Sequence, residues 1–312
     1  MFEKNNKMTE FEKLVDEVRF ITTPTPEKAQ EVINNIRRIL KQYVEDSGLK
    51  SLVLGVSGGL DSAVVAAICQ EKYIGVPLIG LSIPISSSDD HREQAEWVGK
   101  TYCSAFEEFR EWDDEADTIF EKLESTDRIA KKAGFDVKEF PKNVLQGNMK
   151  ARIRMITLFD LARKTNGMVM STDNDSEYQM AFWTIFGDEG NFGPIQNIGK
   201  GFELPVLAKV LGIDDGIIDQ KPSDGLKVSE EDSDEAQLGA NYREVDTITN
   251  IYLERLPISN VKIGDMKSRL LNLINKDDVD GAKKIAKIIN RYHNMSFKRN
   301  GTINLTREEI GI

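Results

Sequence analysis

A Ser-Gly-Gly-Leu-Asp-Ser segment contains the densest set of groups in this chain that could bind a phosphate. Gly58 and Gly59 let the backbone approach an anion closely, and Ser57 and Ser62 add hydroxyl donors. The segment lies between an apolar strand pattern and a helix, so the unpaired amides and positive dipole end of the helix face the same place. Asp61 would repel a phosphate unless a divalent cation such as Mg²⁺ lay between them. The segment therefore predicts a nucleotide phosphate site with a metal ion.

The same segment differs from two other phosphate loops, because it lacks both the lysine of a Walker loop and the G-x-G-x-x-G spacing. It resembles the S-G-G-x-D-S loop of PP-loop ATP pyrophosphatases, which split ATP into AMP and pyrophosphate while activating an oxygen as its adenylate. A tight turn with a serine cap is the alternative. The resemblance implies catalytic roles for Ser57 and Asp61. It implies ATP contacts at Gly55, Val56, Ser57, Gly58, Gly59, Leu60, Asp61 and Ser62.

Later segments are similar in order and spacing to one PP-loop family, the ammonia-dependent NAD synthetases. Residues 147–155 resemble its G-N-x-K-A-R-x-R-M helix, which implies that Arg152 contacts deamido-NAD. A guanidinium there can hold a phosphate or carboxylate through two hydrogen bonds. Residues 171–177 resemble its G-T-D-H-A-A-E segment, which implies that Thr172 binds ATP and that Glu177 joins Asp61 as a magnesium ligand.

Two further segments extend the resemblance. Residues 186–190 resemble the family's Y-G-D-G-G turn, so Asp188 would bind the pyridine end of the substrate, although glycine-flanked aspartates also occur in plain turns. Both interpretations of Asp188 remain open. Lys200 follows near the position of a family lysine that contacts ATP, and the resemblance implies a catalytic role for it. Residues 221–242 resemble a mobile P-T-A-D-L loop and a D-E-x-x-L-G-x-x-Y helix, with Ser223 supplying the hydroxyl that would contact ATP.

The chain departs from the family pattern mainly on the substrate side. Ile185 stands where the family has a lysine that reaches deamido-NAD, and a family aspartate falls on Asn191 or Phe192. The terminal His-Lys pair is reduced to Lys298, because Phe297 precedes it, and an arginine expected near Ser82 is missing. Asn191 and Lys298 are still candidate substrate contacts. Adenylation is therefore better supported than the identity of the acid that is adenylated.

The charge and cysteine content exclude several classes of partner. The chain has 52 acidic and 41 basic side chains in 312 residues, a formal charge of −11, which argues against a nucleic-acid or anionic-membrane surface. Cys69 and Cys103 lie in apolar helical surroundings without metal-ligand spacing, which predicts buried thiols in a reducing compartment. No apolar run approaches the length of a membrane span, and the N-terminus lacks a signal core. We therefore expect a cytoplasmic protein.

Strand and helix patterns alternate along the chain, with apolar strands expected at residues 52–56, 76–83 and 168–172 and helices at 26–47, 60–67, 89–103 and 143–164. The alternation predicts an α/β fold, a parallel sheet flanked by helices on both faces, with ligands beyond the carboxyl ends of its strands. This agrees with the PP-loop (adenine nucleotide alpha hydrolase-like) fold that the resemblance implies. The C-terminal part should be helical, near 235–254 and 280–293, and the acidic run 230–235 should be a solvated loop.

We expect one NAD synthetase-like domain over residues 1–312. Its parts are an N-terminal helical segment (1–48), an α/β core (49–212) and a mobile loop with C-terminal helices (213–312). The resemblance implies a homodimer with substrate near the interface, and residues 80–90 and 220–234 should close over the ligands. Apolar side chains of the N-terminal helix, at Ile33, Ile36 and Leu40, suit dimer surface and intramolecular core equally.

The activity implied by the resemblance is an ATP- and Mg²⁺-dependent amidation of deamido-NAD by ammonia, through an NAD-adenylate, with release of AMP and pyrophosphate. Glutamine-dependent relatives carry an amidohydrolase domain with a cysteine nucleophile, for which this chain offers no candidate, so free ammonia is the expected donor. Two alternatives remain: another PP-loop amidating or adenylating ligase with a different acceptor, and a nucleotide-binding homologue that has lost catalysis.

Overall fold

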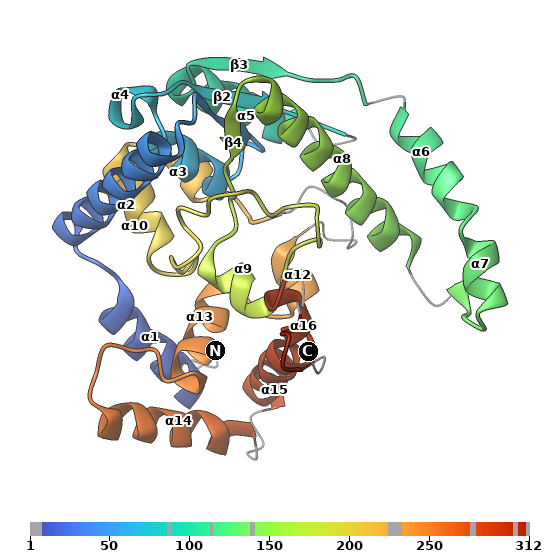
Figure 1. The fold of residues 1–312 in the computed structure, drawn as a ribbon. Helices are drawn as coiled ribbons and strands as arrows, with labels where there is room; N and C mark the ends of the chain where they lie inside the picture. The colour runs from blue at the N-terminus through green and yellow to red at the C-terminus, as the bar shows by residue number, and fades with distance from the viewer. Residues whose placement is uncertain are drawn as a thin grey trace, which may run out of the picture.

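The computed structural model contains a parallel four-stranded sheet in the order β3-β2-β1-β4, which lies near the top of the view in Figure 1. The structure describes residues 8–85, 89–112, 115–137, 141–223, 233–274, 279–301 and 305–309. Its strands are β1 (Ser51–Gly55), β2 (Leu78–Ser82), β3 (Ala105–Glu108) and β4 (Gly167–Val169). Leu52 of β1 pairs with Leu78 on one side and Met168 on the other. The parallel α/β expectation is confirmed, and β3 is a strand that the sequence patterns did not indicate.

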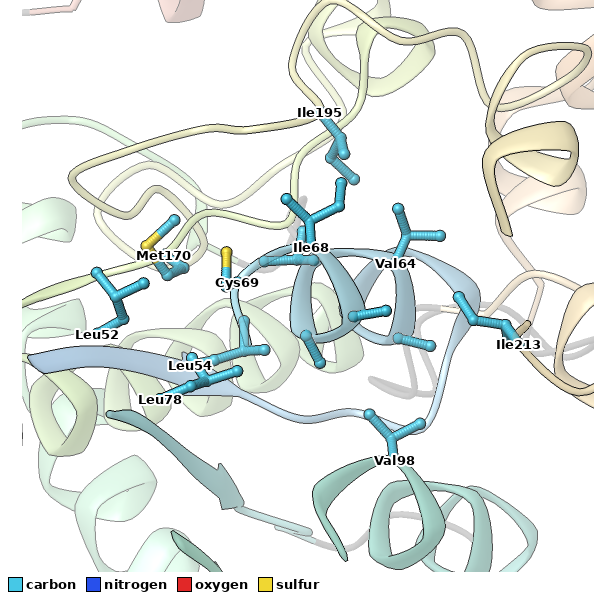
Figure 2. Packing of buried hydrophobic residues seen from close by; sticks show 14 of the residues in the cluster. Leu52, Leu54, Val64, Ile68, Cys69, Leu78, Val98, Met170, Ile195 and Ile213 are labelled. Carbon is cyan, nitrogen blue, oxygen red and sulfur yellow. The ribbon is translucent and has the colours of Figure 1, made fainter. Parts of the chain in front are cut away.

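Alternate residues of β1 pack on opposite faces of the sheet, as the strand period of two requires. Leu52 and Leu54 join a core cluster with the helices of one face, whereas Val53 joins a second cluster on the other. The first face carries α2 (Pro26–Ser47), α3 (Leu60–Ile68), α5 (Asp89–Tyr102) and α10 (Leu204–Leu211), and the second carries α6 (Glu115–Glu124) and α8 (Lys142–Lys164). Figure 2 shows side chains of the first cluster gathered around α3.

Helix α2 begins and ends where its sequence predicts. Thr25 caps the helix by accepting a hydrogen bond from the Lys28 amide, and Gly48 ends it at φ 64°, a left-handed conformation that glycine adopts without strain. Ile33 and Leu40 are fully buried in the core of the same chain. Of the two interpretations of this helix, intramolecular core therefore holds for these two side chains.

A third core cluster joins α1 (Glu10–Thr22) to the C-terminal helices. These helices lie away from the sheet, at the bottom of the view in Figure 1. The helix expected at 235–254 is interrupted, because Gly239 takes φ 77° and separates α12 from α13. The remaining helices are α1 (Glu10–Thr22), α4 (Glu71–Ile74), α7 (Asp127–Lys132), α9 (Asp175–Met180), α11 (Asp215–Ile218), α12 (Asp234–Leu238), α13 (Tyr242–Tyr252), α14 (Asn260–Ile274), α15 (Val279–Asn294) and α16 (Ser296–Arg299). Within the described ranges, every helix is too short or too polar to cross a membrane.

Candidate functional site

A cavity of about 770 Å³ lies at the carboxyl ends of the central strands. Gly55 at the end of β1, Ser82 at the end of β2 and Met170 just after β4 line it. Strand β1 has parallel neighbours on both sides, because the chain runs from β1 to β2 and β3 on one side and then crosses back to place β4 on the other. Such a switch point is where open α/β sheets bind ligands.

The predicted phosphate loop forms the wall of this cavity next to α3. Ser57, Gly59 and Asp61 line the cavity, and the Ser57 and Ser62 hydroxyl oxygens are 3.1 Å apart. Because the N-cap of α3 is Gly59, this position has no side chain to accept hydrogen bonds from the first-turn amides. The N-terminus of α3 therefore presents amide donors and positive dipole charge to an anion in the cavity.

The conformation of the loop depends on Gly58. This residue has φ 84°, and an added Cβ would lie 2.2 Å from the backbone oxygen of His91 in α5. Any larger residue would therefore be strained in its backbone and would also push α5 away. The alternative of a plain serine-capped turn does not account for a loop held this closely between two helices beside a large cavity.

Four charged side chains meet in the cavity wall. The Lys200 ammonium is 2.8 Å from Asp61, 3.2 Å from Glu177 and 3.7 Å from Asp234. The Tyr242 hydroxyl donates to Glu177 at 3.2 Å and to Asp234 at 2.8 Å. Asp61 follows β1 and Glu177 follows β4, and both carboxylates lie within 3.2 Å of the Lys200 ammonium; their role as metal ligands stays a prediction.

The electrostatics of this cluster follow from its burial. The pKa of Glu177 is raised to about 7, mainly by burial, with Lys200 lowering it and the charges of Asp61 and Asp234 adding to the increase. Burial alone would lower the pKa of Lys200, but the carboxylates outweigh it and raise that pKa above its ordinary value. Burial also raises the pKa of Tyr242, so its hydroxyl keeps its proton and remains a donor. Lys200 is thus held permanently charged.

Asn174 fixes the relative positions of Asp61 and Glu177. Its side-chain amide donates to Asp61 at 2.8 Å, and its side-chain oxygen accepts from the Glu177 backbone amide at 3.0 Å. In the same capping box, the Glu177 carboxylate accepts a hydrogen bond from the Asn174 backbone amide at the start of α9. One cap residue therefore links both predicted metal ligands.

The donor set suits a hard divalent cation. Three carboxylates face one ammonium, which leaves an excess of two negative charges if all are ionised. Carboxylate oxygens are the ligands that Mg²⁺ prefers, and this ion usually takes few protein ligands and keeps waters. Among the described residues, no group of three or more His, Cys, Asp or Glu side chains is spaced to hold a metal alone. The excess negative charge and the small number of protein ligands that Mg²⁺ takes fit an ion that shares its coordination with a bound phosphate.

The lining of the same cavity includes the predicted pyridine-side residues Asp188 and Lys298. Asp188 lines the cavity and accepts a hydrogen bond of 2.6 Å from the Thr184 amide. This hydrogen bond closes the turn that contains Gly187. The Lys298 ammonium lines the cavity and donates to the backbone oxygens of Ala181 and Trp183. Asp188 is therefore both a turn residue and a cavity residue.

The cavity lining also includes one ring of an aromatic pair and a buried acid. Trp183 lines the cavity and stacks on Tyr178 with an interplanar angle of 2°. Asp173, beside Thr172 in the cavity wall, is buried and accepts from the Ser171 hydroxyl at 2.9 Å. Burial raises the pKa of Asp173 well above its usual range, and the nearby charges of Glu177 and Asp188 add to the shift.

Several predicted site residues lie outside the described cavity lining. Arg152 is exposed on α8 and donates to the Ile185 backbone oxygen at 3.2 Å. Asn191 accepts from the Val169 amide at 3.0 Å and so extends the edge of β4. Gly58 and Ser62 turn inward and support the loop without lining the cavity. In contrast, Val56, Leu60, Thr172 and Ser223 line it as expected.

Three residues in or next to the charged cluster had no role predicted from the sequence: Asp234, Tyr242 and Asn174. Asp234 belongs to the acidic run that was expected to be solvated, but only 3% of its surface is exposed, and that expectation was wrong for this residue. The rest of the run falls outside the described residues, apart from Ser233, which caps α12, and Glu235. The resemblance to the D-E-x-x-L-G-x-x-Y pattern, which contains Asp234 and Tyr242, was the signal that could have identified two of the three.

The fold and this site together define a PP-loop α/β protein with a nucleotide site beyond its strand ends. A family model described as NAD synthase matches residues 32–301, and the chain belongs to that family, so it is a ligase. The NH(3)-dependent NAD(+) synthetase of Finegoldia magna is 35% identical over 68% of this chain and 80% of its own length. That of Methanosarcina acetivorans is 32% identical over 73% and 83% respectively.

Solved structures support the same fold. NMN synthetase from Francisella tularensis superposes with a TM-score of 0.67 at 24% identity, covering 89% of this chain and 98% of that one. The NH3-dependent NAD synthetase from Campylobacter jejuni gives a TM-score of 0.61 at 23% identity with the same coverage. At these identities the likeness concerns the architecture alone.

Proposed function

We propose that this chain amidates deamido-NAD with ammonia while converting ATP to AMP and pyrophosphate. The observation that carries the proposal is one cavity whose lining includes Ser57, Asp61 and Lys200 together with Asp188 and Lys298. A nucleotide phosphate chain suits the first group of residues, and a second ligand suits the other. The family match over residues 32–301 supports the same activity.

In the proposed phosphate site, amides and side chains of the protein neutralise the negative charge of the ATP phosphates. The amides at the start of α3 and the Ser57 hydroxyl would bind the phosphates, with Thr172 and Ser223 as further contacts in the wall. Lys200 would attract the leaving pyrophosphate, because its buried ammonium stays charged throughout. Asp61 and Glu177 would hold Mg²⁺, which when bound offsets negative charge on the phosphate oxygens.

The proposed reaction has two transfers. The nicotinate carboxylate attacks the α-phosphorus of ATP, the bond to pyrophosphate breaks, and an acyl adenylate forms. Ammonia then attacks the acyl carbon, loses a proton and expels AMP. No residue of the chain needs to form a covalent bond, so catalysis rests on positioning and charge stabilisation.

In the proposed substrate site, the negative charge of Asp188 and the aromatic ring of Trp183 suit a pyridinium. The ring nitrogen of an N-ribosylated nicotinate carries a positive charge, and the cavity lining includes the Asp188 carboxylate and the Trp183 ring. A cationic ring is attracted both by carboxylates and by the face of an indole. Lys298 supplies the positive charge that would attract the nicotinate carboxylate or a substrate phosphate.

Closure and assembly also belong to the proposal. Residues 80–90 and 220–234 would order over the ligands and keep water from the adenylate, although residues 86–88 and 224–232 lie outside the described chain. A homodimer is supported by apolar side chains exposed on α8, at Leu145, Ile156 and Phe159, near exposed Arg152. One functional domain over residues 1–312 is supported because the core and the C-terminal part line the same cavity.

A pyrophosphate-release assay with purified full-length chain tests the activity. We expect sustained, multiple-turnover release that requires ATP, magnesium, ammonia and deamido-NAD together, with stoichiometric NAD and AMP. Release supported only by a different acid would favour another PP-loop ligase. ATP binding without release under every acceptor condition would favour a homologue that has lost catalysis.

Affinity for deamido-NAD should fall as pH rises through about 8. Burial, together with the nearby Arg291 charge, lowers the pKa of Lys298 to about 8, so its ammonium is charged below this pH and neutral above it. Loss of the charge should raise the KM for deamido-NAD by up to about tenfold at pH 9. Initial rates from pH 6.5 to 9.5 measure the effect.

Lys298→Arg is the control for this pH profile, since a guanidinium stays protonated over the whole range. The KM of that variant should change little between pH 7 and 9, whatever its absolute value. An identical pH profile in the wild type and Lys298→Arg would contradict the role of Lys298.

A further inference from the structure

Asp246 is a buried carboxylate that lies behind the charged cluster. It lies in α13, with 2% of its surface exposed, and it falls outside the described lining of the cavity. One of its oxygens accepts from the Ser176 hydroxyl, and the other accepts from the Gly201 amide at 2.9 Å. The carboxylate therefore joins three separate elements: α13, the start of α9 and the turn that precedes α10.

Both of these hydrogen bonds lead directly to the backbone of Lys200. The Ser176 hydroxyl accepts a 2.9 Å hydrogen bond from the Lys200 amide, and Gly201 is the next residue. On the other flank, a Cβ added to Gly199 would lie 2.7 Å from an Asp246 oxygen, so this turn packs directly against the carboxylate. Asp246 thus constrains the backbone on both sides of Lys200.

The same helix also contacts the far side of the cluster. Tyr242 precedes Asp246 by four residues, so the two side chains lie on one face of α13. Tyr242 donates to Glu177 and Asp234, which are two of the carboxylates that surround the Lys200 ammonium. Helix α13 therefore holds the lysine backbone with one side chain and its carboxylate partners with another.

We infer that Asp246 is a positioning residue for Lys200. By holding the Ser176 hydroxyl and the Gly201 amide, it directs the Lys200 ammonium to Asp61 and Glu177. Asp246 touches no ligand in this arrangement and acts only through the turn. The inference rests on the proposed function for the role of Lys200, which is to attract the leaving pyrophosphate. The position of the Lys200 ammonium can be tested without measuring turnover.

A purely architectural role is the competing explanation, and Asp175 provides a matched comparison. Asp175 is also a buried carboxylate at the start of α9, but it is held by Arg255 through hydrogen bonds of 2.8 and 3.0 Å. Its substitution should loosen α9 to a similar extent without releasing the turn that carries Lys200. Effects of Asp246→Asn that Asp175→Asn does not reproduce are therefore specific to the positioning role.

The experiment measures how fast an amine-modifying reagent labels Lys200, by mass spectrometry of the digested full-length protein. Lys200 is buried and paired, so wild-type labelling should be slow. Asp246→Asn should increase the labelling rate at Lys200 about tenfold, because the ammonium leaves the carboxylates more often. Asp175→Asn should leave that rate near the wild-type value. Equal rates in wild type and Asp246→Asn, or equal increases in both variants, would overturn the inference.

Kinetic measurements on the same proteins provide the second readout. Asp246→Asn should lower kcat about tenfold or more with little change in the KM for deamido-NAD, and it should cause no further loss in a Lys200→Ala background. Ser176→Ala removes the hydroxyl that connects Asp246 to the Lys200 amide. This variant replaces Asp246→Asn if Asp246→Asn does not fold. A wild type that fails to turn over deamido-NAD would refute the proposed function, whereas the labelling result would still decide the role of Asp246.

Discussion

Asp61→Asn should abolish ATP-dependent pyrophosphate release while leaving the fold intact. The carboxylate faces the cavity, accepts from Asn174 at 2.8 Å and pairs with Lys200 at 2.8 Å. Asparagine keeps its shape and one acceptor oxygen but loses the charge that a hard cation requires. We expect kcat to fall by at least about 10²- to 10³-fold, the usual effect of removing one electrostatic contact in a preorganised site.

The stability of Asp61→Asn should change little, because Lys200 keeps Glu177 and Asp234 as partners. Thermal unfolding and pyrophosphate release over a magnesium titration measure the two effects separately. Asp160→Asn is the control, since this carboxylate is exposed on α8 and pairs only locally with Lys164. Undiminished turnover of Asp61→Asn at ordinary magnesium concentrations would show that Asp61 holds no metal.

The phosphate site could be predicted from sequence because its determinants are local. A strand, a glycine turn and a helix follow one another within a short segment, and each step has its own residue preferences. Gly58 is needed for a left-handed turn that packs against α5, and Gly59 leaves the first-turn amides of α3 without a side-chain cap. The proximity of Asp61 and Glu177 was also expected from the sequence, because parallel neighbouring strands end at one edge of the sheet.

The rest of the site depends on contacts that local patterns do not encode. Tyr242 reaches Glu177 because α13 packs against α9, far away in sequence, and Asp234 of α12 joins the cluster through the Tyr242 hydroxyl and Lys200. An acidic run is usually solvated, so the composition around Asp234 gave the wrong expectation until burial was known. Asp246 is similarly ordinary in sequence, and its importance lies in a hydrogen bond across 70 residues to Ser176.

The substrate end was predicted less completely for a related reason. Lys298 comes from the C-terminal helices and Asp188 from a loop, so the third core cluster and the sheet must be assembled before they share a cavity. Arg152 was placed on the correct helix, but its side chain faces outward. Helical residues two apart point in different directions, which is why Arg154 lines the cavity and Arg152 does not.

Lys200→Met should lower both activity and stability, and the stability loss should depend on pH. The ammonium faces Asp61, Glu177 and Asp234 in a buried setting, and breaking such a network by removing one partner costs about 3–5 kcal/mol. Methionine has a similar volume, so lost charge rather than a cavity would account for the change. With no cation to stabilise the leaving pyrophosphate, kcat should fall by about 10²- to 10³-fold.

The pH dependence of Lys200→Met follows from the direction of the Glu177 shift. In the wild type Lys200 opposes a burial effect that raises the pKa of Glu177 to about 7, so removing the lysine should raise that pKa further. A carboxyl whose folded pKa exceeds its unfolded value contributes stability at low pH and loses it as pH rises through the folded pKa. Lys200→Met should therefore lose more stability relative to wild type at pH 8 than at pH 6 in thermal unfolding. Lys209→Met, on the exposed side of α10, should match the wild type at both values, and a Lys200→Met deficit independent of pH would mean that Glu177 is not the group left uncompensated.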